Sequence, residues 1–151
     1  MKIGDLHKLL ARVYRIHRKC SYTRLAQLDV TPGQPRLLDY LIQHDGCIQK
    51  DISTDCDLEP ATVTNILIGM EKSDLIRREC DPNDRRSMHV YLTEKGMQTH
   101  KQVEAVFAQL EGECFEGFSK DEKKLSMQLM QRMYENLKKA DGTSLDAKSD
   151  Q

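Results

Sequence analysis

The sequence lacks the long apolar runs, catalytic motifs and clustered metal ligands that define several large classes of protein. No apolar stretch approaches the roughly 18 residues that a membrane helix needs, and no secretory signal opens the chain. The five histidines are scattered without a metal-ligand pair at helical spacing, and there is neither a nucleophile motif nor a glycine-rich phosphate loop. We therefore expect a cytoplasmic protein that is not an enzyme, needs no cofactor or metal, and has no membrane partner.

Cysteines are present but do not form a recognisable framework. The five cysteines are an odd number, and no two of them form a C-x-x-C pair, so neither a disulfide framework nor a zinc ribbon is indicated. We expect reduced thiols. An alternative is a metal site with irregularly spaced ligands, drawn from His44, Cys47, Cys56 and Cys80.

The chain also lacks an excess of charge, with 23 Lys or Arg against 24 Asp or Glu and a formal net charge of -1. This balance counts against nucleic-acid binding, because affinity for phosphates comes largely from basic side chains. The distribution is uneven, however: residues 1–40 hold eight basic and three acidic residues, and residues 104–151 hold seven basic and ten acidic residues. A basic face and an acidic face can therefore exist within a neutral total.

What is present is typical of a globular protein with one domain. The chain has 151 residues, of which 38% are hydrophobic and 31% are charged, so it can bury a core. We assign residues 1–139 to a single domain. Residues 140–151 are small and polar, and we expect them to form a disordered tail.

One stretch, residues 58–72, predicts a helix with two different faces. Four apolar residues recur at helical spacing and predict the buried face: Val63, Ile66, Leu67 and Met70. The opposite face carries small, uncharged residues, most of which have hydrogen-bonding groups: Ala61, Thr62, Thr64 and Asn65. Such side chains suit the edges of bases in a DNA major groove, because Asn can pair with adenine and the Thr methyl group fits that of thymine. The alternative is an ordinary amphipathic helix.

The segments on either side of this helix favour DNA recognition. Upstream, apolar residues at every fourth position from Ile48 predict a short helix that ends in a turn at Asp57. Two helices joined this tightly form a helix-turn-helix. Downstream, residues 75–80 and 87–92 predict two strands, and the charged, turn-rich residues 81–86 between them predict a hairpin with a basic tip.

The tip of this hairpin and the residues after it carry the most specific signal in the chain. The sequence DPNDRRS at residues 81–87, followed by LTEKG at residues 92–96, resembles the wing and the next helix start of the MarR (multiple antibiotic resistance regulator) family. Asp74 departs from the family pattern by standing where Gly is usual, but Asp tolerates the left-handed conformation of such a turn. Ile68 and Gly69 depart from it by replacing a polar pair.

The resemblance extends over about residues 5–139 and implies a mainly α fold with a small β wing (α+β). A winged helix-turn-helix would occupy about residues 31–92, and dimerisation helices would occupy about residues 4–28 and 93–139. Apolar stripes along these terminal helices support this arrangement, because outside the compact winged domain they need a second copy of the chain to pack against. We therefore expect a homodimer.

Capping signals predict where two of the helices begin. The sequence TPGQ at residues 31–34 combines a capping box with Pro at the first helical position, and predicts a helix from Thr31 to about Gly46. The predicted core face of this helix consists of Leu37, Leu38, Leu41 and Ile42. A second capping box at residues 119–122 predicts the start of the last helix.

Charged residues beside the helix-turn-helix and in the wing are candidate DNA contacts. The resemblance implies that Arg86 reaches the minor groove or steadies the wing through an aspartate, and Asp84 is the expected tether. We expect sequence-independent phosphate contacts from Lys50, Arg77 and Arg85. The alternative for a charged pair at a hairpin tip is a purely solvated role.

The resemblance also suggests an effector site and a thiol sensor. Many members of the family are released from DNA by small aromatic or anionic molecules, for which the candidate lining residues are Tyr14, Arg15, His17, Arg18 and Tyr40. The same residues could instead belong to the dimer interface. Some members sense oxidants through a cysteine in the first helix, where Cys20, beside Arg18 and Lys19, is the candidate.

The main hypothesis is a transcription regulator that binds double-stranded DNA as a homodimer, at a near-palindromic operator. We expect a repressor that responds to a ligand. Two alternatives remain open: a thiol-based redox-sensing regulator of the same fold, and a winged-helix protein-interaction module that has lost DNA binding.

Overall fold

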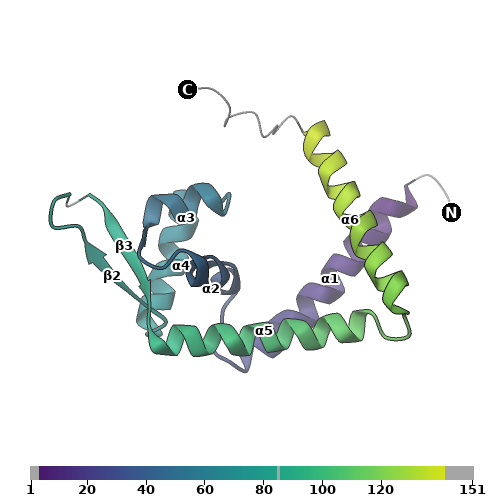
Figure 1. Ribbon diagram of the computed structural model, residues 1–151, viewed down its shortest axis with the longest axis horizontal. Coiled ribbons are helices and arrows are strands. Elements are labelled where there is room, and N and C mark those ends of the chain that lie inside the picture. The colour runs from purple at the N-terminus through teal and green to yellow at the C-terminus, as the bar shows by residue number, and fades with distance from the viewer. Residues whose placement is uncertain (1–3, 85, 142–151) are drawn as a thin grey trace. The chain divides into compact units, whose positions relative to one another are not determined.

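Helices and one small sheet make up the computed structural model, which describes residues 4–84 and 86–141 (Figure 1). The elements in chain order are α1 (Asp5–Ala26), α2 (Gln34–Gln43), β1 (Cys47–Ile48), α3 (Gln49–Asp55), α4 (Pro60–Lys72), β2 (Ile76–Cys80), β3 (Met88–Leu92), α5 (Glu94–Cys114) and α6 (Lys120–Ala140). They divide into two compact units, one that ends at Leu110 and one that begins at Glu111. The predicted mainly α fold with a small β wing is confirmed. None of the helices in the described residues is long and apolar enough to cross a membrane.

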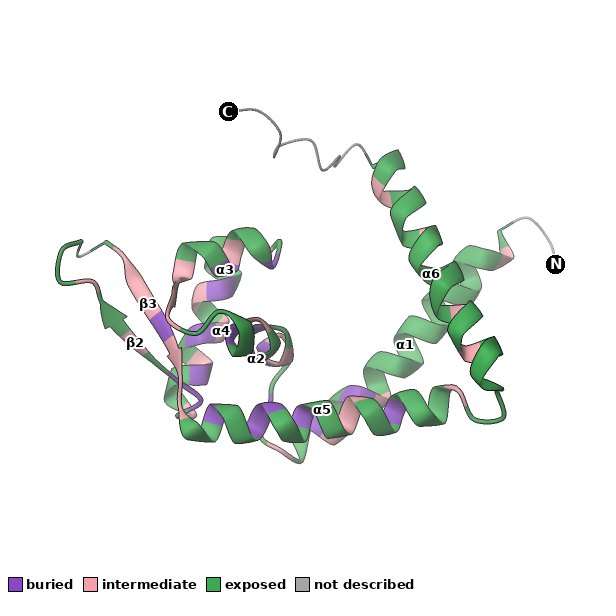
Figure 2. Ribbon diagram, viewed as in Figure 1, coloured by how far each residue is buried: buried purple, intermediate pink, exposed green. Residues whose placement is uncertain are grey.

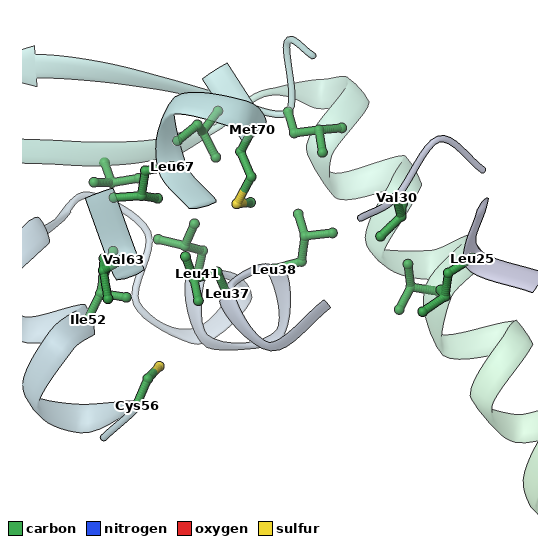
Figure 3. Packing of buried hydrophobic residues seen from close by; sticks show 14 residues of the cluster. Leu25, Val30, Leu37, Leu38, Leu41, Ile52, Cys56, Val63, Leu67 and Met70 are labelled. Atoms are coloured by element: carbon green, nitrogen blue, oxygen red, sulfur yellow. The ribbon is translucent and has the colours of Figure 1, made fainter. Parts of the chain in front are cut away.

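The core of the first unit lies between α2 and α4. Leu38 and Leu41 of α2 are fully buried, as is Leu67 of α4, and Figure 3 shows Met70 of α4 pointing toward the two leucines of α2. The predicted stripe of α4 is thus buried, apart from Ile66, which is only partly buried. One predicted core residue of α2 is exposed: Ile42 is 43% accessible. The reason is geometric: at about 100° per residue, Ile42 lies about 140° around the helix from Leu37 and about 100° from Leu41, so it falls at the edge of the buried stripe.

The start of α2 corrects a second prediction, because the helix begins at Gln34 and not at Thr31. Gly33 precedes it with a φ of 90°, a left-handed conformation that interrupts a right-handed helix. Half of the predicted capping box still forms, since the Gln34 side-chain oxygen accepts a hydrogen bond from the Thr31 N–H at 3.1 Å. The Pro in the first helical turn is Pro35, not Pro32.

A tight turn between α3 and α4 forms the predicted helix-turn-helix. Asp57 has a φ of 51°, and the Ser53 hydroxyl donates a hydrogen bond to the Leu58 carbonyl at 2.6 Å. The prediction that Ile48 belongs to the first helix of this motif is wrong, because Ile48 lies in strand β1 and pairs with His89. The strand of two residues is too short to leave a pattern in the sequence, and it forms through pairing with β3.

The wing is the antiparallel hairpin of β2 and β3, and it extends beside α3 and α4 (Figure 1). With β1 it forms a sheet in the order β1-β3-β2, in which Ile76 pairs with Leu92 and Cys80 pairs with Met88. Asp74 has the left-handed φ, 59°, that its place before β2 was expected to require.

The terminal helices bury little of their apolar surface within the chain. In α1 only Ser21 and Leu25 are buried, and α6 has no buried residue, as the exposed colouring in Figure 2 shows. The predicted capping box of α6 is confirmed, because Ser119 and Glu122 exchange both hydrogen bonds. The tail predicted for residues 140–151 lies, apart from its first two residues, outside the described residues.

Candidate nucleic-acid interface

A groove of about 740 Å³ lies between the helix-turn-helix and the wing. Its polar lining residues come from α3 and from the wing: Gln49, Lys50, Ser53, Thr54, Asp84, Arg86 and Ser87. Lys50 and Arg86 are exposed and place one positive charge on α3 and one on the wing. Within the described residues neither side chain forms an ion pair. The groove can therefore accept a chain of anionic groups such as phosphates.

Asp84 holds the tip of the wing in shape. Its carboxylate accepts a hydrogen bond from the Arg86 backbone N–H at 3.0 Å and another from the Ser87 hydroxyl at 2.8 Å. Asp84 thus tethers Arg86, as the sequence suggested, but through the backbone of Arg86. The guanidinium group of Arg86 takes no part in this hydrogen bond. Asp84 can therefore hold the backbone of the wing while the positive charge of Arg86 remains available for another contact. Arg85, the other candidate in the wing, lies outside the described residues.

Thr64 differs from the other residues of the predicted outer face of α4. It is half-buried, and its hydroxyl donates to the Pro60 carbonyl at 2.9 Å while accepting a hydrogen bond from the Gln49 side-chain nitrogen at 2.8 Å. A hydroxyl has one proton, so Thr64 has no donor left for a base. The other predicted residues of this face are exposed: Ala61, Thr62 and Asn65.

Gln49 is a residue of the groove that the sequence analysis did not select. It is the first residue of α3, and Thr64 holds its side chain in place from α4. An amide can both donate and accept hydrogen bonds, so a fixed Gln49 can contact a phosphate or a base edge. No local pattern marks this residue, because its position depends on a contact across 15 residues of sequence.

The strand β2 carries two arginines that already have acidic partners. Arg77 is ion-paired with Glu79, and its guanidinium group lies 4.5 Å from the centre of the Tyr91 ring. Arg78 binds Glu71 at 2.5 and 3.0 Å, and these hydrogen bonds hold the pKa of Glu71 below its usual range. A phosphate contact by Arg77 would therefore compete with an existing ion pair.

His89, near the tip end of β3, connects the wing to the loop before β1. Its Nδ1 lies 2.8 Å from the Gly46 carbonyl oxygen, and its Nε2 lies 3.5 Å from an oxygen of the Asp81 carboxylate. The Gly46 carbonyl is the main cause of a raised pKa at His89, and Asp81 adds to it. The pKa of Asp81 is lowered, mainly by the backbone N–H of Asn83 and also by His89.

The candidate effector residues do not form one cluster within the chain. The Tyr40 hydroxyl donates to the Asp55 carboxylate at 2.6 Å, which ties Tyr40 to the end of α3. Arg15 borders a separate hollow of about 410 Å³ whose lining residues all belong to α1. Tyr14 is exposed, and Arg18 lies over the ring of Tyr22 at 5.0 Å. His17 is exposed on α1.

The cysteines differ in how accessible their thiols are. Cys20, the candidate sensor, is partly buried, whereas Cys80 and Cys114 are exposed. Burial raises the pKa of the Cys47 thiol to about 11 and also raises that of Cys56. Because the thiolate is the reactive form, these two thiols are poor nucleophiles at neutral pH. Among the described residues, no group of three or more His, Cys, Asp or Glu side chains is placed to hold a metal ion.

Two helices joined by a tight turn, followed by a hairpin beside them, define the class of winged helix-turn-helix proteins. Residues 30–88 match the model of the MarR family. A solved structure of MarR is 27% identical, has a TM-score of 0.78, and aligns over 95% of this chain and 99% of its own. The chain thus resembles the MarR family in sequence and in fold, as the wing motif suggested.

Two further relatives show the range of the similarity. The uncharacterized HTH-type transcriptional regulator YwaE of Bacillus subtilis (strain 168) is 31% identical over 80 residues, which span 53% of this chain and 47% of YwaE. The match thus covers about half of the length of that relative. A Staphylococcus aureus MepR–DNA complex is 25% identical, with a TM-score of 0.73, and aligns over 90% of this chain and 98% of MepR.

Proposed function

We propose that the protein is a transcription regulator that binds double-stranded DNA in a sequence-specific way. The observation that carries this proposal is the groove between α3 and the wing, because it brings Lys50 and Arg86 to one surface. Pro60, the first residue of α4, borders this groove, and the outer face of the same helix exposes Asn65. In this arrangement α4 enters the major groove and Asn65 contacts base edges. Lys50 binds a phosphate of the flanking backbone, and Arg86 reaches the minor groove. Solved structures of MepR and MarR with DNA are similar to this chain in fold.

The proposed regulator acts as a homodimer and as a repressor that responds to a ligand. Support for the dimer comes from the unburied apolar residues of α1 and α6, each considered by itself. A two-fold dimer would place identical helices α4 in successive major grooves, so we expect a near-palindromic operator with half-site centres about 10 base pairs apart. Support for a small anionic or aromatic effector comes from the cationic hollow of α1, which contains Arg12, Arg15 and Lys19.

The experiment that tests this function compares a positioning contact with a base contact. Binding of the full chain is measured across a salt series on two duplexes: the DNA upstream of its own gene and a random duplex. Replacing Lys50 by Ala should weaken binding to both and lower the salt slope by about one unit per contact, or about two per dimer. Replacing Asn65 by Ala should cost about 1–3 kcal/mol on the specific duplex and little on the random one.

Circular dichroism of both variants controls for folding. The assignment of Lys50 to a phosphate contact and of Asn65 to a base contact is wrong if the two variants lose the same affinity on both duplexes. If the unaltered protein binds neither duplex at low salt, the DNA-binding function itself fails, and the chain is better explained as a winged-helix module for protein association.

A further inference from the structure

Ile68 is an exposed apolar residue on a face of α4 that is otherwise small or polar. Its side chain is 49% accessible, whereas Val63, Leu67 and Met70 on the core face of the helix are fully buried. With 3.6 residues per turn, one outward stripe of α4 contains four residues, all of them exposed. They are Ala61, Asn65, Ile68 and Lys72. Ile68 therefore faces the same side of the molecule as the proposed base contact Asn65, about one turn further along.

The size of this apolar feature helps to identify what covers it. A stable protein interface buries about 800 Å² on each partner, far more than one isoleucine between polar residues can supply. The major groove of DNA instead presents single apolar groups, the 5-methyl groups of thymine, among hydrogen-bonding base edges. A lone aliphatic side chain in a polar stripe has the pattern that such a surface requires.

The charges around Ile68 are also compatible with DNA. Lys72 continues the stripe with a positive charge and, within the described residues, has no ion-pair partner. The acid next to it, Glu71, is held by Arg78 at 2.5 and 3.0 Å, so a positive group lies directly against its negative charge. Repulsion between this face and a phosphate backbone is thereby reduced.

We infer that Ile68 recognises the 5-methyl group of a thymine in the major groove, next to the base contacted by Asn65. The inference rests on the proposed function and deepens it, because it assigns a base preference to one position of each half-site. Removal of a buried methyl group should weaken binding about fourfold, at the free energy typical of one such group.

The test exchanges thymine for deoxyuridine, which lacks only the methyl group. A duplex is first selected from a randomised library by the full, unaltered chain, and each thymine is then replaced in turn. We expect one position in each half-site at which deoxyuridine weakens binding about fourfold. Because the dimer contains two copies of Ile68, Ile68→Ala should bind the thymine duplex about as weakly as the unaltered protein binds a duplex with deoxyuridine at both half-site positions, and it should not respond to the exchange. The matched control is Ile42→Ala, which removes a similarly exposed side chain, 43% accessible, from α2 and should keep the response.

Every outcome of this experiment either supports or contradicts the proposed contact between Ile68 and thymine. Loss of the thymine response in Ile68→Ala alone supports the inference. If the unaltered protein selects a sequence but responds to no deoxyuridine, or if Ile68→Ala keeps the response, the thymine contact is wrong while DNA recognition stands. If the selection enriches no sequence, the proposed function fails and the inference fails with it.

Discussion

Two glycines within helices show how surroundings decide the role of a residue. Gly69 of α4 has room for a methyl group, since an added Cβ would lie at an ordinary contact distance, 3.5 Å, from the nearest atom, the Gln34 side-chain nitrogen. Gly96 of α5 is packed against the chain, because an added Cβ would lie 2.0 Å from the Leu75 carbonyl oxygen. The sequence alone makes both look like weak points of a helix, whereas only Gly69 costs stability without a packing benefit.

We expect opposite effects from replacing these glycines by alanine. Gly69→Ala should raise the free energy of unfolding by about 0.5–1 kcal/mol, because alanine restricts the unfolded chain and favours the helix. Gly96→Ala should lower it by about 1–3 kcal/mol, because the backbone around Leu75 must move. Urea unfolding followed by circular dichroism, at one fixed protein concentration, measures both. Gly112→Ala is the control for α5, since nothing lies within 4 Å of its added Cβ. Equal effects at Gly69 and Gly96 would refute this account.

At the scale of an element, the wing depends on a histidine held between two acceptors. A neutral imidazole donates from only one nitrogen, so His89 satisfies both Gly46 and Asp81 only when it is protonated. Glu79, opposite His89 in the sheet, is already paired with Arg77. The Tyr91 ring stacks near the His89 ring, with 6.4 Å between the ring centres. Asp81 is therefore the acid that bridges to His89, at the end of the two strands nearest the wing tip.

We expect the wing to lose stability as the pH rises above about 6.5. The pKa of His89 is raised in the folded chain, so its contribution is fully present below its ordinary value of 6.5 and is lost as the pH rises through the raised value. The pKa of Asp81 is lowered from 3.8, so its contribution is lost as the pH falls below that value. Hydrogen-exchange protection factors of the β2 and β3 amides, corrected for the intrinsic rate, should therefore fall from pH 6 to pH 8.

A variant of His89 separates charge from shape in this experiment. His89→Asn keeps a donor near the position of Nδ1 but has no titratable group, so its protection factors should not change between pH 6 and pH 8. Asp81→Asn should bring the pKa of His89, followed by NMR, back toward its ordinary value. A pH-independent wing in the unaltered protein would show that the bridge contributes nothing to its stability.

At the scale of the whole molecule, exposed apolar helices favour association of two chains. In α6, Leu125 is 53% accessible and Leu137 is 63% accessible, and no residue of this helix is buried. Its apolar residues recur at helical spacing on one face, which is typical of a helix that packs against a partner. In α1, large apolar residues are exposed in the same way, and the most accessible of them are Leu6, Tyr14 and Ile16.

We expect the full chain to sediment as a dimer that substitutions in α6 dissociate. Leu129→Glu together with Leu137→Glu should raise the dissociation constant more than a hundredfold, because each buried leucine contributes about 1.5–3 kcal/mol. Gln128→Glu, on the opposite face of α6, adds one negative charge per chain, against two in the double variant, and should leave the dimer intact. Sedimentation velocity over a range of concentrations distinguishes these variants. A soluble monomer of the unaltered chain would contradict the proposed assembly.

Local sequence determined the parts of this protein that depend on neighbours in the chain. Helical periodicity predicted Val63, Leu67 and Met70 as core residues, and they are fully buried. The left-handed turns at Asp57 and Asp74 followed from residue types that tolerate positive φ. The α6 capping box and the exposure of several proposed site residues followed in the same way: Lys50, Ala61, Thr62, Asn65 and Arg86.

Only the tertiary structure decided what depends on contacts between distant residues. Strand β1 forms through pairing with β3, more than 40 residues away, and the Thr64 hydroxyl is occupied because Gln49 lies beside it. The groove combines α3 with a wing more than 25 residues further along the chain. The periodicity of one helix indicates which of its sides is apolar. A groove or a paired strand depends instead on which segments lie next to each other in the folded chain. That choice depends on the packing of the whole core, so no short stretch of sequence contains it.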